Sequence, residues 1–136
     1  MDQSEVTFKI GELDVNHEWF DYLSDAEKSD IEEDKKRGVT HSVCVVIDQQ
    51  ETFGAFIDVT PEFSIHVREV GGNFPKFIQW LEIYCHALGR FYKAKDITVC
   101  ARREGVGFIA KRLGFSHENT TDEFYKEVDY GRQIIK

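Results

Sequence analysis

Residues 63–92 read FSIHVREVGGNFPKFIQWLEIYCHALGRFY, and this stretch decides the fold. Its first part, residues 63–67, alternates apolar and polar side chains, which predicts a strand with one buried face. Two consecutive glycines and Asn73 then interrupt the strand. Apolar residues recur after them at helical spacing, which predicts a long helix over residues 74–94. We expect Asn73 to cap this helix, because its side chain can accept a hydrogen bond from the first turn.

The sequence on either side of this stretch continues a mixed pattern of strands and helices. Strands are predicted at 6–10, 42–47, 53–59, 96–100 and 123–128, one or two helices at 17–37, and a short helix at 104–113. The run at 42–47 is apolar nearly throughout, which predicts a strand that is covered on both faces. The order of elements is typical of an α/β (α+β) protein, with a mixed sheet and helices on both faces.

Length and charge indicate a single acidic domain over residues 1–136. The chain is 41% hydrophobic, which excludes a disordered protein, and its net charge of −8 argues against nonspecific nucleic-acid binding. Residues 1–37 hold 12 acids and 5 bases, a net charge of −7, whereas residues 68–112 hold 4 acids and 9 bases, a net charge of +5. The basic segment would attract a small polyanion. A solvated acidic helix beside a mildly basic one explains the same charges.

Cysteines, histidines and hydropathy suggest neither a metal site nor a membrane protein. The three cysteines, Cys44, Cys85 and Cys100, lie in apolar runs without CxxC spacing, which predicts buried thiols in a reducing compartment. The five histidines are scattered without the spacing of metal ligands. No apolar run approaches the roughly 18 residues of a membrane span, and no signal peptide is recognisable. We therefore expect a cytoplasmic protein without a bound metal.

The element order, together with Arg-Leu-Gly-Phe at 112–115, resembles the GCN5-related N-acetyltransferase (GNAT) superfamily. Small, divergent bacteriophage members, including an internal virion protein class, are most similar in length and in this ending. The resemblance implies a GNAT fold, with a mostly antiparallel mixed sheet, and an acyl-CoA such as acetyl-CoA as the cofactor. In that family CoA lies where two parallel strands part, which corresponds here to residues 63–70 and 97–101. A phage protein would be located in the host cytoplasm or the virion.

In that family a glycine turn between strand and helix holds the CoA diphosphate, with the pattern Arg/Gln-x-x-Gly-x-Gly/Ala. Close approach of main-chain N–H groups to a phosphate requires residues without bulky side chains. Residues 68–73 match the first arginine and the first glycine but have asparagine at the last position. The resemblance assigns cofactor binding to Arg68, Val70, Gly71, Gly72 and Asn73. A plain strand-to-helix turn capped by Asn73 explains these residues equally well.

A second string, residues 102–107, fits the same glycine pattern at every position. It lies too near the C-terminus, because the family requires several further elements after its phosphate loop. Arg102 and Arg103 are still weaker candidates for contacts with a polyanion, since guanidinium groups bind phosphate oxygens in pairs.

Acyl transfer to an amine needs a general base and often an acid for the leaving thiolate. Glu62, His66 and Glu69 are the candidate bases by their position near the strand, and nothing in the sequence selects among them. The tyrosine that commonly serves as the acid in the family is replaced by Ala110. The first hypothesis is therefore an acyl-CoA-dependent N-acyltransferase-like protein with weak or lost catalysis.

The second hypothesis is a non-catalytic phage virion or host-interaction protein that uses the GNAT fold as a scaffold. The predicted helix 74–94 has a second apolar face, which includes Trp80, Tyr84, Ala87 and Phe91. Such a face is typical of a protein interface, so we expect a protein partner or self-association through it. Nucleic-acid mimicry by the acidic N-terminal third is a third hypothesis, although a solvated helical face explains those charges more simply.

Overall fold

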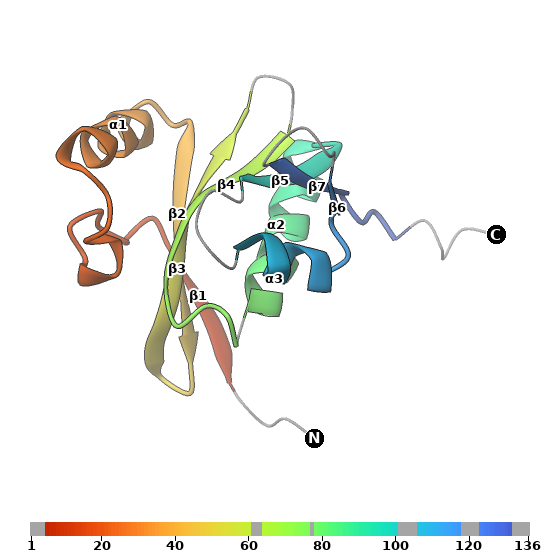
Figure 1. Ribbon diagram of the computed structural model, residues 1–136, viewed down its shortest axis with the longest axis horizontal. Coiled ribbons are helices and arrows are strands. Elements are labelled where there is room, and N and C mark those ends of the chain that lie inside the picture. The colour runs from red at the N-terminus through yellow and green to blue at the C-terminus, as the bar shows by residue number, and fades with distance from the viewer. Residues whose placement is uncertain (1–4, 61–63, 77, 101–105, 118–122, 132–136) are drawn as a thin grey trace. The chain divides into compact units, whose positions relative to one another are not determined.

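The computed structural model describes residues 5–60, 64–76, 78–100, 106–117 and 123–131 (Figure 1). In chain order the elements are β1 (Val6–Ile10), the 3-10 helix η1 (Glu18–Phe20), α1 (Asp25–Lys36), β2 (Thr40–Ile47), β3 (Gln50–Val59), β4 (Ser64–Gly72), α2 (Ile78–Tyr92), β5 (Asp96–Cys100), α3 (Val106–Arg112), β6 (Ser116–His117) and β7 (Glu123–Glu127). Seven strands form a sheet in the order β1-β2-β3-β4-β5-β7-β6. Among the described registers only β4 and β5 are parallel. The predicted mixed, mostly antiparallel sheet with helices is confirmed.

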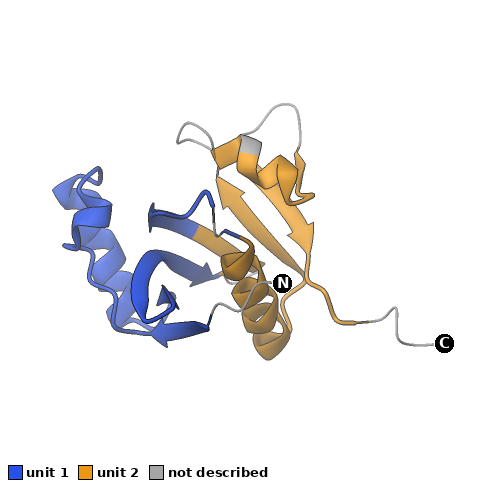
Figure 2. Cartoon of the chain, turned by 90° about the horizontal axis from the view of Figure 1, so that it is seen from below, with its two compact units in different colours: residues 1–59, 68–78 blue, residues 60–67, 79–136 orange. Residues whose placement is uncertain are grey.

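The chain divides into two compact units (Figure 2). Unit 1 comprises residues 1–59 and 68–78, and unit 2 comprises residues 60–67 and 79–136. Strand β4 therefore belongs to both units, with its first four residues in unit 2 and the remainder in unit 1.

Unit 1 contains the β2–β3 hairpin, whose turn is tighter than the sequence predicts. The polar run at 48–52 predicts a five-residue turn, but only Asp48 and Gln49 lie between the strands. Both have positive φ, 51° and 68°, as in the two-residue turns that match the twist of a hairpin. β2 is buried at every position except His41, which confirms a strand covered on both faces.

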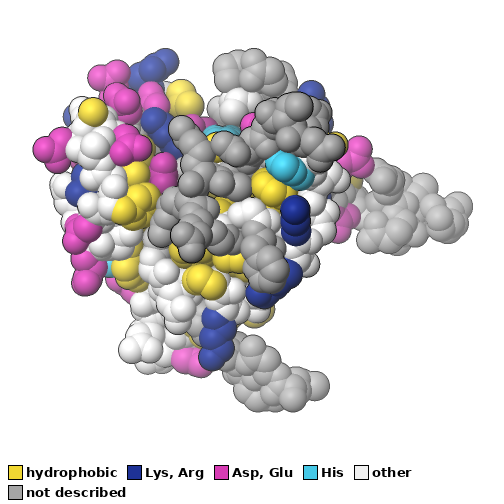
Figure 3. All heavy atoms as spheres, viewed as in Figure 1, with side chains coloured by type: hydrophobic (Ala, Val, Ile, Leu, Met, Phe, Trp, Pro, Cys, Tyr) yellow, Lys and Arg dark blue, Asp and Glu magenta, His cyan; other side chains and the backbone are white. Residues whose placement is uncertain are grey.

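Helix α1 of unit 1 begins with a reciprocal cap. The N–H of Glu27 donates to Oγ of Ser24 at 3.1 Å, and the N–H of Ser24 donates to Oε1 of Glu27 at 2.9 Å. Both Ser24 and Ser29 could cap a break in the predicted helical region 17–37; Ser24 is the cap of α1, and Ser29 lies inside the helix. Acidic side chains gather over the α1 part of unit 1, at the left of Figure 3. The apolar side of this helix faces a core of Leu13, Val15, Phe20, Leu23, Ile31 and Phe56.

Helix α2 starts later than the predicted range of 74–94, and the prediction that Asn73 caps it is wrong. β4 continues to Gly72, and the N–H of Asn73 then donates to the carbonyl of Thr52 on β3 at 2.9 Å. Because the main chain stays bonded to β3, the helix begins only at Ile78. The glycines that were expected to end the strand are its last two residues.

The exposed face of α2 also differs from the predicted one. Ile83 and Phe91 are 50% and 77% exposed, and Ala87 between them is exposed as well. These three residues are four apart, so they form one stripe along the helix. Trp80 and Tyr84, which were expected on the same outer face, are half-buried. The position of the stripe differs because the buried side is formed by Leu81, Cys85 and Gly89.

Two of the three cysteines are buried, as predicted. Cys44 and Cys85 are 3% and 1% exposed, whereas Cys100 is only partly buried. Burial raises the pKa of Cys44 to about 11 and that of Cys85 to about 12, because an apolar environment disfavours the thiolate. Both thiols are therefore protonated and unreactive at neutral pH.

Candidate functional site

The parallel pair β4–β5 has a short register. Pairing runs from Ser64 with Asp96 to Val67 with Val99, and β4 then continues to Gly72. Arg68 is described but is not paired with β5 in that register. The resemblance predicts that these two strands part near this point, and β5 itself ends at Cys100.

Side chains also bridge the two strands within the paired region. The hydroxyl of Ser64 donates to the Asp96 carboxylate at 2.5 Å. Nδ1 of His66 lies 2.7 Å from the hydroxyl of Thr98. His66, one of the three candidate bases, is thus held against its neighbouring strand within unit 2.

The last two residues of β4 must be glycine for reasons of packing in unit 1. A Cβ on Gly71 would lie 2.6 Å from the carbonyl oxygen of Trp19. A Cβ on Gly72 would lie 2.7 Å from Cα of Phe53, and Gly72 has a φ of +96°, which disfavours any other residue. Close packing therefore accounts for both glycines without a bound phosphate.

Arg68, the expected phosphate ligand, is held by carboxylates of unit 1. Its guanidinium donates to Asp34 at 2.8 Å and to the hydroxyl of Thr40 at 3.2 Å, and it lies 3.5 Å from Asp58. Burial alone would lower the pKa of Arg68, but the hydrogen bond to Asp34 and the charge of Asp58 outweigh it and raise the pKa. This arginine joins α1, β2 and β3 to β4.

Glu69 is the candidate base that lies beside the glycine turn in unit 1. The hydroxyl of Tyr22 donates to Oε1 of Glu69 at 2.7 Å, and the carbonyl of Val70 lies 3.3 Å from the same hydroxyl. Tyr22 and Glu69 are 47 residues apart in the sequence, and Tyr22 is 42% exposed. Tyr22 lies in the predicted helical region 17–37, and nothing in its local sequence pointed to Glu69 as its partner.

Of the remaining residues singled out from the sequence, only Ala110 lies among the described residues. Glu62, Arg102 and Arg103 lie outside them. Ala110, which stands where the family has a tyrosine, is 4% exposed within unit 2 and has no group that can donate a proton.

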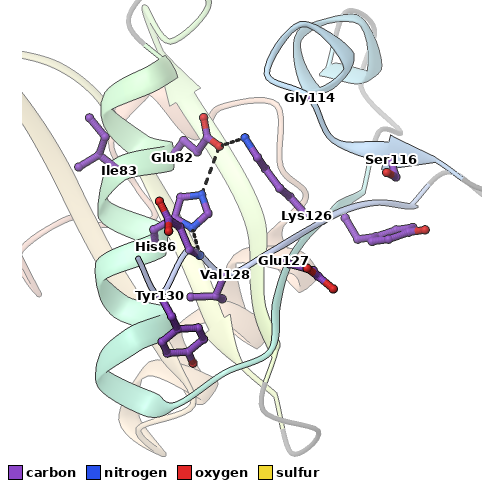
Figure 4. Close-up of a pocket in the computed structure, with 11 residues that line it drawn as sticks. Glu82, Ile83, His86, Gly114, Ser116, Lys126, Glu127, Val128 and Tyr130 are labelled. Carbon is purple, nitrogen blue, oxygen red and sulfur yellow. Dashed lines mark hydrogen bonds and ion pairs between the residues drawn. The ribbon is translucent and has the colours of Figure 1, made fainter. Parts of the chain in front are cut away.

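A pocket of about 760 Å³ lies within unit 2, lined by α2, by Gly114 and Ser116 at the start of β6, by β7 and by residues 128–130. Figure 4 shows Glu82 and His86 from α2 and Lys126 from β7 pointing toward one another. Lys126 Nζ donates to Oε2 of Glu82 at 2.5 Å and to the carbonyl of Leu113 at 2.8 Å. Nε2 of His86 lies 3.3 Å from the same Glu82 oxygen. Sequence reasoning missed this pocket, although Glu82 and His86 have the i, i+4 spacing of helical neighbours.

Neither a metal-binding cluster nor a membrane-spanning helix is present in the described ranges. In these ranges no group of three or more His, Cys, Asp or Glu side chains is arranged to hold a metal ion. No helix among the described residues is long and apolar enough to cross a bilayer.

Sequence comparisons and structural comparisons give different results. No protein-family model matches the sequence, and no curated protein matches it significantly. The fold is similar to that of a Bacillus subtilis acetyltransferase in complex with CoA, with a TM-score of 0.67 and 12% identity over 92% of this chain and 100% of that one.

Two further solved structures are similar. The paiA N-acetyltransferase from Thermoplasma acidophilum, in complex with coenzyme A, has a TM-score of 0.60 and 11% identity, and the alignment covers 91% of this chain and 99% of that one. A Desulfovibrio desulfuricans protein assigned to the GNAT acetyltransferases has a TM-score of 0.62 and 15% identity, with 92% and 100% covered. The chain therefore has the fold of the GNAT acetyltransferases.

Proposed function

We propose that this protein binds an acyl-CoA along the C-terminal half of β4 and is an N-acyltransferase with weak or lost catalysis. The observation that carries the proposal is the β4–β5 register, which ends at Val67 and Val99 in a fold shared with acetyltransferases that hold CoA. Main-chain groups of residues 70–73 are the proposed diphosphate contacts, because N–H groups bind phosphate oxygens without a charged side chain. Arg68 supports this segment through its carboxylate partners.

Bound acyl-CoA would supply a thioester carbonyl for attack by an amine. Glu69 is the proposed base, since its carboxylate takes the proton that the attacking nitrogen loses. Tyr22, which donates to Glu69 at 2.7 Å, is the proposed acid: it would give its proton to the departing thiolate and regain one from Glu69. Ala110 supplies no second donor, so we expect slow turnover.

Calorimetry with acetyl-CoA tests binding, and release of free CoA with spermidine and lysine peptides as acceptors tests transfer. We expect a Kd below about 1 mM. Glu69→Gln should leave this affinity unchanged and lower turnover by about 10²-fold or more, since it removes the general base. Glu33→Gln on the exposed side of α1 is the matched control and should change neither quantity.

Absence of acetyl-CoA binding at millimolar concentration would contradict the proposed cofactor. If acetyl-CoA binds but Glu69→Gln turns over at the wild-type rate, the cofactor assignment stands and the assignment of the base is wrong. Binding without turnover by the wild type supports lost catalysis.

A second candidate function is non-catalytic binding of a protein partner through the exposed α2 stripe. Ile83 and Phe91 are 50% and 77% exposed, and large exposed side chains of this kind are typical of interaction sites. The phage virion or host-interaction protein proposed from the sequence belongs to this class.

The stripe predicts self-association that depends on Phe91. Light scattering after size exclusion should give a mass above that of one chain at high concentration, and Phe91→Asp should restore the mass of one chain. This residue is so exposed that the substitution should leave the free energy of unfolding within about 0.5 kcal/mol of wild type. A single-chain mass for the wild type at every concentration argues against self-association.

A further inference from the structure

A short segment after β7, residues 128–131, is held along helix α2, and we call it the strap. Both main-chain groups of Asp129 are bonded to α2. Its N–H donates to Nδ1 of His86 at 3.0 Å, and its carbonyl accepts from Nη1 of Arg90 at 2.6 Å. His86 and Arg90 are one helical turn apart, so they extend from the same face of α2. The two side chains thus form hydrogen bonds with the main-chain N–H and carbonyl of Asp129, as a neighbouring strand would.

Packing and two further residues complete the attachment of the strap. Val128 is 3% exposed, and its Cγ2 lies 2.7 Å from where a Cβ on Gly89 would be. The N–H of Val128 donates to the carbonyl of Lys95 at 3.0 Å. The hydroxyl of Tyr130 donates to the carbonyl of Ala94. The strap therefore follows α2 closely.

The hydrogen bond from Asp129 determines which form of His86 fits. Nδ1 must carry a lone pair in order to accept the N–H of Asp129, so the proton of the neutral ring is on Nε2. Nε2 then donates to Glu82, whose Oε2 is 3.3 Å away. A second proton on the ring would occupy Nδ1 and face the N–H of Asp129. The closed strap therefore binds the neutral imidazole.

Charged groups lie near His86 on each element packed against it. α2 contributes Glu82 and Arg90, β7 contributes Lys126, and the strap contributes Asp129, whose carboxylate accepts the N–H of Gly131 at 2.8 Å. Glu82 favours a cationic ring, but the same Oε2 already accepts from Lys126 at 2.5 Å. However, attraction to Glu82 does not compensate the N–H of Asp129, which loses its acceptor when Nδ1 of His86 carries a proton. Protonation of the ring therefore weakens the strap contact whatever its effect on the rest of unit 2.

We propose that the strap is a pH-sensitive clamp, closed on α2 while His86 is neutral and loosened when His86 takes up a proton. The sign follows from the acceptor role of Nδ1, because the contact exists at high pH and is lost as the pH falls. Val128, Asp129 and Tyr130 also line the 760 Å³ pocket, so the clamp controls one wall of that pocket (Figure 4). This inference does not depend on acyl-CoA binding.

Amide hydrogen exchange by NMR tests the clamp in the full chain. The protection factor of the Asp129 amide is compared between about pH 8 and pH 5, the range in which histidine ordinarily changes charge. We expect it to fall about tenfold toward low pH, which is the factor that one ordinary hydrogen bond contributes. The protection factor of the Cys85 amide, in the middle of α2, should stay constant.

His86→Asn is the informative variant, because its side-chain oxygen accepts a hydrogen bond at any pH. It should keep Asp129 protected and remove the pH dependence. His17→Asn is the matched control, since Nδ1 of His17 also accepts a main-chain N–H, from Trp19 at 3.1 Å in unit 1. It should leave the pH profile of Asp129 unchanged. Two results would overturn the proposal. One is a protection factor of Asp129 that does not change with pH in the wild type, and the other is a pH dependence that persists in His86→Asn.

Discussion

Gly72→Ala is expected to lower the free energy of unfolding by about 3 kcal/mol or more. Two costs add at this position. A non-glycine residue is strained at a φ of +96°, and the new Cβ would lie 2.7 Å from Cα of Phe53 and 2.8 Å from the carbonyl oxygen of Thr52. Both contacts are with main-chain atoms of β3, which cannot move aside as a flexible side chain does. Urea denaturation followed by circular dichroism measures the loss.

Gly38→Ala separates the two costs. Gly38 has a similar φ of +80°, but nothing lies within 4 Å of a Cβ built there. We therefore expect a loss of only about 1 kcal/mol, the conformational cost alone. Equal losses for the two variants would mean that close approach to β3 does not determine the identity of Gly72. Binding of a ligand near residue 72 would then be the better explanation for the glycine at this position.

Arg68→Ala is expected to destabilise the protein by about 2–3 kcal/mol, whether or not acyl-CoA binds. The substitution leaves the carboxylates of Asp34 and Asp58, which are 25% and 18% exposed, without their shared cation. Removing one partner of a poorly solvated ion pair costs more than the pair contributes, because the charge that remains is only partly compensated. Unfolding in urea at neutral pH measures the effect.

Arg37→Ala provides a control on the same carboxylate. Arg37 also contacts Asp34, at 3.3 Å, but its side chain is 65% exposed, so solvent screens the pair. We expect a loss of no more than about 1 kcal/mol. If Arg68→Ala keeps wild-type stability and instead abolishes acetyl-CoA binding, the guanidinium is a phosphate ligand and its role in joining the elements of unit 1 is secondary.

Sequence patterns predicted those elements whose signals are local. The alternating residues of β1 and the apolar run of β5 have their predicted bounds, Val6–Ile10 and Asp96–Cys100. The pattern Ser-x-x-Glu at Ser24 belongs to a cap that forms between residues three apart. The predicted start of α2 was wrong because the main chain at Asn73 is hydrogen-bonded to Thr52 on another strand. Local sequence patterns do not report such a contact.

The candidate site shows the same division. The resemblance assigned Arg68 to cofactor binding, and Glu69 was one of three candidate bases. Their partners are far away along the chain: Asp34 is 34 residues from Arg68, and Tyr22 is 47 residues from Glu69. Pairing of residues so distant depends on how strands and helices pack, and neither periodicity nor spacing encodes it. The His86 contact with Asp129 was missed for the same reason, since 43 residues separate them.

By itself, the sequence determined the order and type of the elements other than the two-residue strand β6, because apolar periodicity and caps act over a few residues. Only the tertiary structure decided which side chains meet. In the folded chain Arg68 pairs with two aspartates, and close contact with β3 requires glycine at position 72. His86 accepts a hydrogen bond from the main-chain N–H of Asp129. Each of these contacts joins segments that are distant in the chain. Steric fit and desolvation determine such contacts, and local sequence patterns do not report them.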